Sequence, residues 1–216
     1  MKTSILLADD HQVIIDGLKA LLSGEPDMEV IGQATDGLHV LPKVLELKPE
    51  VVVLDLMMPG LGGLEVARQL RDRAPATKVI ILSMHSNDAY VVEALRNGAA
   101  GYVLKQAEAR ALIDAIRAVR GGGRYLSPPL SEDKLARWET DAKAAPFDPY
   151  DTLSTREREV LQLAAEGLTS AAIGERLTIG KRTVETHRAN LQRKLGVRTQ
   201  ADLVRFAVKK GLVGVD

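Results

Sequence analysis

Residues 51–60 read VVVLDLMMPG, an apolar run that stops at an acid. Its first four residues form the continuous Val/Leu run that is typical of a strand buried on both faces. Asp55 follows where that strand should end, and Pro59 and Gly60 then turn the chain away. A single Asp at a strand end is often a helix cap or a partner of backbone amides. Its role therefore depends on which other acids lie near it.

The same order of a strand followed by a helix occurs five times in the first 120 residues. Short apolar runs predict strands at 4–8, 28–34, 51–54, 78–82 and 101–104. Apolar residues at helical spacing predict helices near 11–23, 37–47, 62–74, 88–97 and 108–120. This alternation predicts a doubly wound, five-stranded parallel α/β sheet, with right-handed crossovers and helices on both faces.

The rest of the chain has a different pattern. Residues 121–149 contain the Gly- and Pro-rich segments GGGRYLSPP and KAAPFDP, which predict a linker with one short helix around Trp138. Residues 150–216 are wholly helical in pattern. We therefore expect three parts: a domain at 1–120, a linker at 121–149 and an all-α four-helix domain at 150–216.

Helix signals divide this last domain. The stretch Ser154-Thr155-Arg156-Glu157 is a capping box that begins the first helix, and Gly167 ends it. Thr169 caps a second helix, and two more are expected at 181–195 and 200–210.

Charge is unevenly distributed although the chain is neutral overall. From Thr152 onward there are 12 Lys and Arg against 7 Asp and Glu, whereas residues 1–151 hold 17 against 22. A basic second half suggests a polyanionic partner. The chain has no cysteine, which excludes disulfides and thiolate metal sites. No apolar run approaches the roughly 18 residues of a membrane span, so we expect a cytoplasmic protein without a signal peptide and without a membrane partner.

Several polar residues fall at the ends of the expected strands. Asp9 and Asp10 end the first, Asp55 the third, Ser83 the fourth, and Lys105 the fifth. The carboxyl ends of parallel strands converge on one edge of the sheet, so these side chains should meet. Three carboxylates repel one another, and Mg²⁺ would relieve that repulsion. An Asp beside Mg²⁺ could then act as a nucleophile toward a phosphoryl group, with the Ser hydroxyl and the Lys ammonium on its oxygens.

This ordered set resembles the receiver domain of two-component response regulators, a flavodoxin-like fold, over about residues 3–120. The matching segments are LADDH, VVLDLMMPG, ILSMH and GYVLK. The resemblance implies that Asp55 is the phosphoacceptor for a histidine kinase. It also implies that Asp10, Asp55 and the carbonyl of Met57 bind Mg²⁺, with Asp9 acting through water.

The same resemblance assigns roles to the fourth and fifth strand ends. Ser83 would be the switch hydroxyl, Tyr102 the aromatic side chain that moves with it, and Lys105 the counter-charge to the phosphoryl oxygens. Many receivers have a cis proline after this lysine, whereas Gln106 follows Lys105 here.

The basic segment TSAAIGERLTIGKRTVETHRANLQRKL (169–195) predicts two helices joined by a tight turn at 178–180. This is the helix-turn-helix arrangement, in which the second helix enters the major groove of DNA. Val184, Leu191 and Leu195 should face the core. The opposite face carries the candidate DNA contacts, namely Lys181, Arg182, Thr183, Glu185, Thr186, Arg188, Ala189 and Lys194.

Residues 150–214 resemble the LuxR-type DNA-binding domain, and the two halves together resemble the NarL/FixJ family of transcriptional regulators. The resemblance implies that Glu185, Thr186 and Ala189 read bases, while Lys181, Thr183, Arg188 and Lys194 contact the DNA backbone. Gly180 stands where a serine often caps the recognition helix.

Control by phosphorylation is also implied. The unphosphorylated receiver would occlude the recognition helix, and phosphorylation would release it for dimer formation on inverted-repeat promoter sites. RNA polymerase is a further candidate partner. The expected dimer surface is the apolar part of the last helix: Leu203, Val204, Ala207 and Val208.

Three alternatives remain at this point. An aspartyl-phosphate hydrolase also uses an acid at a strand end, but its DxD arrangement needs an acid at position 57, which is methionine. A LuxR-type regulator that senses a small molecule would need a ligand pocket in the first domain and would leave the acids idle. A receiver-like domain that works without phosphorylation would keep the acids only as structure.

Overall fold

The computed structural model describes residues 2–86, 88–130 and 149–214, which form two compact units. The first holds all the strands and the second is helical, and each is described by itself. The short helix expected around Trp138 lies outside the described residues.

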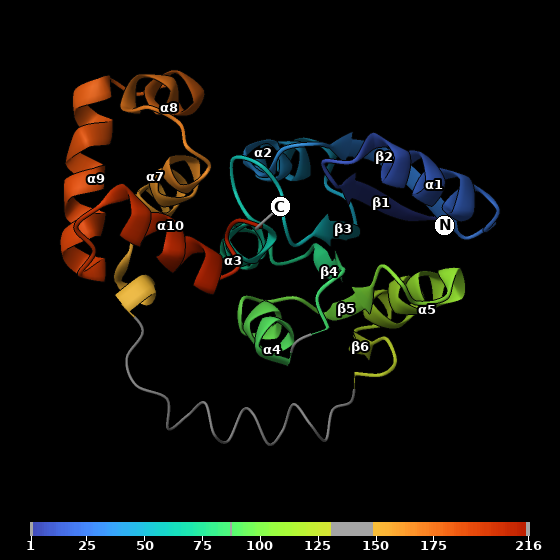
Figure 1. Ribbon diagram of the computed structural model, residues 1–216. Coiled ribbons are helices and arrows are strands. Elements are labelled where there is room, and N and C mark those ends of the chain that lie inside the picture. The colour runs from blue at the N-terminus through green and yellow to red at the C-terminus, as the bar shows by residue number, and fades with distance from the viewer. Residues whose placement is uncertain (1, 87, 131–148, 215–216) are drawn as a thin grey trace. The chain divides into compact units, whose positions relative to one another are not determined.

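The first unit is built on a parallel sheet with the strand order β2-β1-β3-β4-β5-β6 (Figure 1). The strands are β1 (Thr3–Ala8), β2 (Met28–Ala34), β3 (Val51–Asp55), β4 (Lys78–Ser83), β5 (Gly101–Leu104) and β6 (Tyr125–Leu126). Every residue of β3 is buried, as its continuous apolar run predicted. The doubly wound parallel fold is therefore confirmed.

Five helices, α1 to α5, accompany the strands, and they cover the two faces of the sheet (Figure 1). They are α1 (Gln12–Ser23), α2 (Gly37–Leu47), α3 (Gly63–Arg73), α4 (Asp88–Arg96) and α5 (Ala109–Arg120). Apolar residues of α1 and α5 pack on alternate residues of the strands, including Ile5 and Leu7 of β1 and Val51 and Val53 of β3. Because alternate residues point to opposite faces, Leu6, Val52 and Leu54 are buried on the other side.

The expected number of strands was wrong. A sixth strand, β6, pairs in parallel with β5 through Gly101 with Tyr125 and Tyr102 with Leu126. These residues lie in the Gly- and Pro-rich segment that predicted a linker. Because β6 has two residues and no strand-like pattern, it forms only where the free edge of β5 offers partners. The sheet therefore extends past residue 120.

The second unit contains a 3₁₀ turn, η1 (Pro149–Thr152), and four helices. The helices are α7 (Thr155–Ala165), α8 (Ser170–Leu177), α9 (Lys181–Leu195) and α10 (Gln200–Lys209). The expected capping box is present, because Ser154 accepts from the Glu157 amide while the Glu157 carboxylate accepts from the Ser154 amide. Helix α7 packs against α8, α9 and α10.

The turn between α8 and α9 is tight. Thr178 has a left-handed backbone, with φ of 54°, and the Ile179 amide donates to the Gly174 carbonyl at 2.9 Å. A Cβ atom on Gly174 would lie 2.7 Å from the Ile179 carbonyl oxygen, so the close approach requires glycine. Val184 and Leu191 are fully buried and hold α9 in the unit's core. No helix within the described residues is both long and apolar enough to cross a membrane.

Candidate functional site

The polar residues at the strand ends do meet at one edge of the sheet. Asp55 is the last residue of β3, and Lys105 follows β5. The Lys105 Nζ atom lies 2.7 Å from Asp9 Oδ2 and 3.2 Å from Asp55 Oδ1. Asp9 and Asp55 are 2% and 5% exposed. The structure thus brings together an ammonium and two buried carboxylates that are far apart in the sequence.

Burial dominates the electrostatics of this cluster. Desolvation raises the pKa of Asp55 to about 6, and Lys105 opposes that rise while Asp9 and Asp10 add to it. Burial alone would lower the pKa of Lys105, but its contacts with Asp9 and Asp55 raise it above the ordinary value. Lys105 therefore remains a cation that partly compensates the charge of the acids. Ionisation of Asp55, in contrast, is disfavoured by its burial.

Ser83 and Tyr102 lie together beside this cluster. The Ser83 Oγ atom accepts from the His85 amide at 3.1 Å, and the Tyr102 hydroxyl donates to the His85 carbonyl at 2.7 Å. Burial raises the pKa of Tyr102 to about 12, and its interaction with Ser83 opposes this rise. Both side chains thus fix the same loop after β4, through the backbone of His85.

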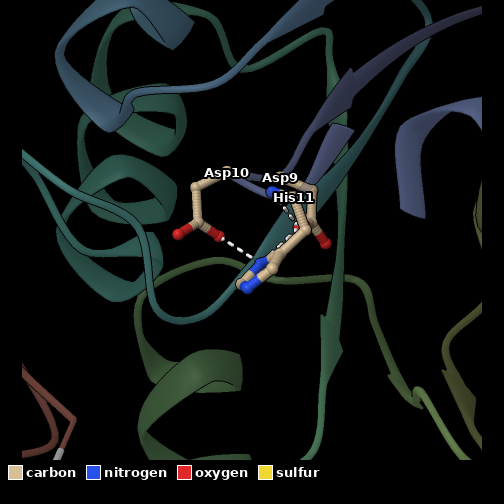
Figure 2. A group of neighbouring side chains, drawn as sticks. All are labelled: Asp9, Asp10 and His11. Atoms are coloured by element: carbon tan, nitrogen blue, oxygen red, sulfur yellow. Dashed lines mark hydrogen bonds and ion pairs between the residues drawn. The ribbon is translucent and has the colours of Figure 1, made fainter. Parts of the chain in front are cut away.

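Asp10 and His11 form the outer part of the site (Figure 2). The His11 Nδ1 atom lies 2.8 Å from Asp10 Oδ1 and 3.3 Å from Asp9 Oδ1. Asp10 is one-third exposed and His11 mostly exposed. For His11, directly after the two acids, the sequence favours a surface or capping role over a role in shaping access to the site. His11 stands at the N-cap of α1, where its side chain makes no capping hydrogen bond.

The donor set fits Mg²⁺. Asp9 and Asp55 share the Lys105 ammonium, and Asp10 lies near enough for its charge to raise the pKa of Asp55. The three carboxylates therefore exceed the positive charge that Lys105 supplies. Asp9 Oδ2 is buried and, apart from its ion pair with Lys105, has no hydrogen-bond partner among the described residues. Mg²⁺ prefers oxygen ligands and usually keeps several of its waters. The site offers carboxylate oxygens, and it is open to solvent at Asp10. The residues present therefore fit the Mg²⁺ ion that the sequence predicts.

In the second unit, α9 presents a polar face. Val184, Leu191 and Leu195 are buried, as the spacing predicted. Residues Lys181, Arg182, Thr183, Glu185, Thr186 and Ala189 are exposed on the remaining surface. The Thr186 hydroxyl donates to the Arg182 carbonyl at 3.0 Å, which leaves its oxygen lone pairs for an outside donor.

Two of the expected DNA contacts have partners inside the unit. Arg188 donates to Gln200 Oε1 at 2.8 Å and lies 3.5 Å from Ser170 Oγ, so it bridges the starts of α8 and α10. The Lys194 Nζ atom donates to Glu157 Oε2 at 2.6 Å. Both cations are therefore held by neighbouring helices. Lys181, by contrast, is exposed and lies 3.8 Å from the carboxylate of Glu185 on its own helix.

The expected dimer surface needs a correction. Leu203 and Ala207 are fully buried, because they occupy the face of α10 that packs on α7. They cannot also form a free surface. Val204 and Val208 are partly exposed and remain candidates.

Comparison with known proteins gives the family. Residues 5–117 match the family model for the response regulator receiver domain. Residues 151–207 match the model for bacterial regulatory proteins of the luxR family. The oxygen regulatory protein NreC of Staphylococcus aureus is 38% identical over 213 residues, which cover 97% of this chain and 98% of NreC.

Solved structures agree with these matches. A LuxR-family two-component response regulator from Aurantimonas sp. SI85-9A1 is 31% identical, with a TM-score of 0.59, covering 67% of this chain and all of that one. RcsB of Salmonella enterica serovar Typhimurium, bound to a promoter in the presence of the phosphomimetic BeF₃⁻, is 26% identical, with a TM-score of 0.56. That match covers 95% of this chain and 98% of RcsB.

These matches select among the alternatives that the sequence left open. The first unit is a receiver rather than a hydrolase or a small-molecule sensor, and a receiver implies a histidine kinase as partner. The second unit is a LuxR-type DNA-binding domain, which implies DNA as partner. The chain therefore belongs to the NarL/FixJ-type two-component response regulators, a family of DNA-binding transcription regulators.

Proposed function

We propose that Asp55 accepts a phosphoryl group from a histidine kinase and that this modification controls dimerisation and DNA binding. The observation that supports this best is the Lys105 ammonium 3.2 Å from the Asp55 carboxylate. A buried carboxylate needs a fixed counter-charge if it is to gain a second negative charge on phosphorylation. Lys105 supplies that charge, and its pairing with Asp9 holds it in place.

The transfer can be written for the residues of this chain. A carboxylate oxygen of Asp55 attacks the phosphorus atom, the P–N bond to the kinase histidine breaks, and an acyl phosphate forms. Ionised Asp55 is the reactive form, so its pKa of about 6 leaves it mostly reactive at neutral pH. Lys105 and the Ser83 hydroxyl then bind the phosphoryl oxygens.

Asp9, Asp10, Asp55 and the Met57 carbonyl would hold Mg²⁺, with Asp9 acting through water. When bound, the ion supplies positive charge that offsets the three carboxylates and the incoming phosphoryl oxygens. Asp10 and Asp55 are near enough for the charge of Asp10 to raise the pKa of Asp55, which supports their sharing one ion.

For DNA binding, we propose that α9 enters the major groove. Exposed Glu185, Thr186 and Ala189 would read bases, and exposed Lys181, Arg182 and Thr183 would contact the DNA backbone. Two copies of the domain on an inverted repeat would double the contact area, with RNA polymerase as a further candidate partner.

The test is phosphorylation of the full chain by acetyl phosphate, followed by intact-mass analysis. One phosphoryl group should be added in the presence of Mg²⁺, and none after Asp55→Asn or with chelator. Asp114→Asn, a change at a half-exposed acid of α5, is the matched control and should label normally. Labelling that survives Asp55→Asn would contradict the assignment of the phosphoacceptor.

A further inference from the structure

Ser127 is a fully buried serine directly after β6, and both of its polar groups bind β5. Its amide donates to the Tyr102 carbonyl at 3.0 Å. Its Oγ atom accepts from the Leu104 amide at 2.9 Å. The side chain therefore continues the β5–β6 ladder for one more hydrogen bond, at the point where Pro128 ends the strand.

These bonds lie next to the phosphoryl site. The residue after Leu104 is Lys105, whose amide donates to the Ser83 carbonyl on β4 at 2.8 Å. The end of β5 is thus held from both edges: by Ser83 on one side and by the Ser127 hydroxyl on the other. Because β6 pairs with β5 only at Gly101 and Tyr102, the Ser127 hydroxyl supplies the bond from this edge to Leu104, the last residue of β5.

The Lys105 side chain depends on this anchoring. Its ammonium must lie within hydrogen-bond distance of Asp9 and Asp55 at once, at 2.7 and 3.2 Å. A backbone that shifts at Leu104 moves the start of the lysine side chain. The Lys105 ammonium must lie against the charge that develops on the phosphoryl group. A displacement of the ammonium by about 1 Å is therefore enough to slow the reaction strongly.

We propose that Ser127 is a positioning residue of the phosphoryl site, which fixes the end of β5 and thereby places the Lys105 ammonium against Asp55. This inference rests on the proposed function, because it assumes that Asp55 is phosphorylated. It also makes the residues just after α5, outside the range 5–117 that matches the receiver family model, a part of the reactive site.

A double-mutant cycle distinguishes this role from a general structural one. Ser127→Ala should slow phosphorylation of the full chain by acetyl phosphate by roughly 3- to 10-fold, because Lys105 is displaced. Lys105→Ala should slow it more. If Ser127 acts through Lys105, the double variant should react at the rate of Lys105→Ala alone.

Ser4→Ala is the matched control. The Ser4 Oγ atom also accepts a backbone hydrogen bond, from the Glu50 amide at 3.0 Å, but it lies at the start of β1 rather than at the reactive edge. Its removal should leave the phosphorylation rate unchanged. If Ser127→Ala does not fold, Ser127→Cys preserves the volume of the side chain with a much weaker acceptor and enters the same cycle.

Each outcome decides one question. A parent protein that gains no phosphate contradicts the proposed function and not the role of Ser127. Phosphorylation that is normal after Ser127→Ala or Ser127→Cys, with faster exchange of the Leu104 amide proving that the bond is lost, overturns the inference. Effects of Ser127→Ala and Lys105→Ala that multiply also overturn it, because Ser127 would then act independently of the lysine.

Discussion

The Lys194 ammonium of α9 lies 2.6 Å from the Glu157 carboxylate of α7. The same oxygen, Oε2, accepts from the Ser154 amide at 2.7 Å and so completes the capping box of α7. Glu157 is 4% exposed and Lys194 one-third exposed at its side chain. One carboxylate thus joins the start of α7 to the last turn of the recognition helix, which gives Lys194 a structural role beside its expected contact with DNA.

Replacing Lys194 by Met should therefore destabilise the helical unit. Glu157 would remain buried without its counter-charge, which costs about 1–3 kcal/mol of unfolding free energy at neutral pH. Burial alone would raise the pKa of Glu157, but Lys194 and Ser154 lower it below its ordinary value of 4.5. This stabilisation is therefore fully present above that pH and is lost as the pH falls through the folded-state pKa. Urea unfolding at several pH values measures it.

The same variant tests how Lys194 acts on DNA. If its main role is the ion pair, Lys194→Met should weaken binding without changing the slope of log affinity against log salt. Lys181→Met is the comparison, because the Lys181 side chain is 66% exposed and free to reach a phosphate. That variant should make the slope shallower by about 0.9 per domain. Equal changes of slope in both variants would assign Lys194 to the DNA backbone.

Asp55→Asn should stabilise the metal-free chain. The pKa of Asp55 is raised from 3.8 to about 6, so the folded state resists its ionisation. This cost is fully present above pH 6 and disappears below pH 3.8. The substitution should therefore add up to about 3 kcal/mol at pH 7.5, and roughly half of that at pH 5. Denaturant unfolding of both proteins at the two pH values checks it.

Magnesium provides the control for that experiment. A cation at the carboxylates should stabilise the parent with increasing concentration and should stabilise Asp55→Asn much less, because the variant has lost a ligand. Equal stabilisation of the two proteins would show that Asp55 is not part of the metal site.

Gly63→Ala should damage the site through the backbone. A Cβ atom on this first residue of α3 would lie 2.2 Å from the Asp55 carbonyl oxygen and 2.9 Å from the Leu56 Cα atom. Neither backbone atom can yield without moving Asp55, so we expect a loss of about 1–3 kcal/mol and slower phosphorylation. Gly17→Ala is the opposite case, since open space surrounds Gly17 within α1. It should raise stability by about 0.5–1 kcal/mol. Thermal unfolding and intact mass compare the two.

The sequence predicted the elements whose signals are local. Continuous apolar runs predicted the strands that place Asp55 and Lys105 at their carboxyl ends, and the capping residues Ser154 and Thr169 marked helix starts that the structure confirms. The sequence also predicted that Asp9, Asp55 and Lys105 meet, because parallel strands bring their carboxyl ends to one edge of the sheet.

What the sequence did not predict depends on contacts between distant segments. The strand at Tyr125–Leu126 exists because β5 has a free edge, and no pattern within two residues can show that. In α10, the four residues of the expected dimer surface are two adjacent pairs, so spacing alone did not decide which of each pair faces inward. Packing against α7 decides which residues face inward. Leu203 and Ala207 are buried, and Val204 and Val208 remain partly exposed.

Val204 and Val208 lie on the partly exposed face of α10. A homodimer on DNA that uses α10 must use its partly exposed face, so Val204→Lys should prevent pairing by placing a charge there, while the buried core stays intact. The phosphorylated parent should bind an inverted repeat, with half-sites about 10 bp apart, more tightly than a single half-site. Val204→Lys should bind the repeat only as well as one half-site, and should keep its half-site affinity. Leu203→Ala is the contrasting variant, since a fully buried leucine should cost about 2–5 kcal/mol of stability and weaken both complexes alike. Gel-shift titrations on both DNAs measure these affinities, and a Val204→Lys protein that still prefers the repeat would exclude this face of α10 from the dimer.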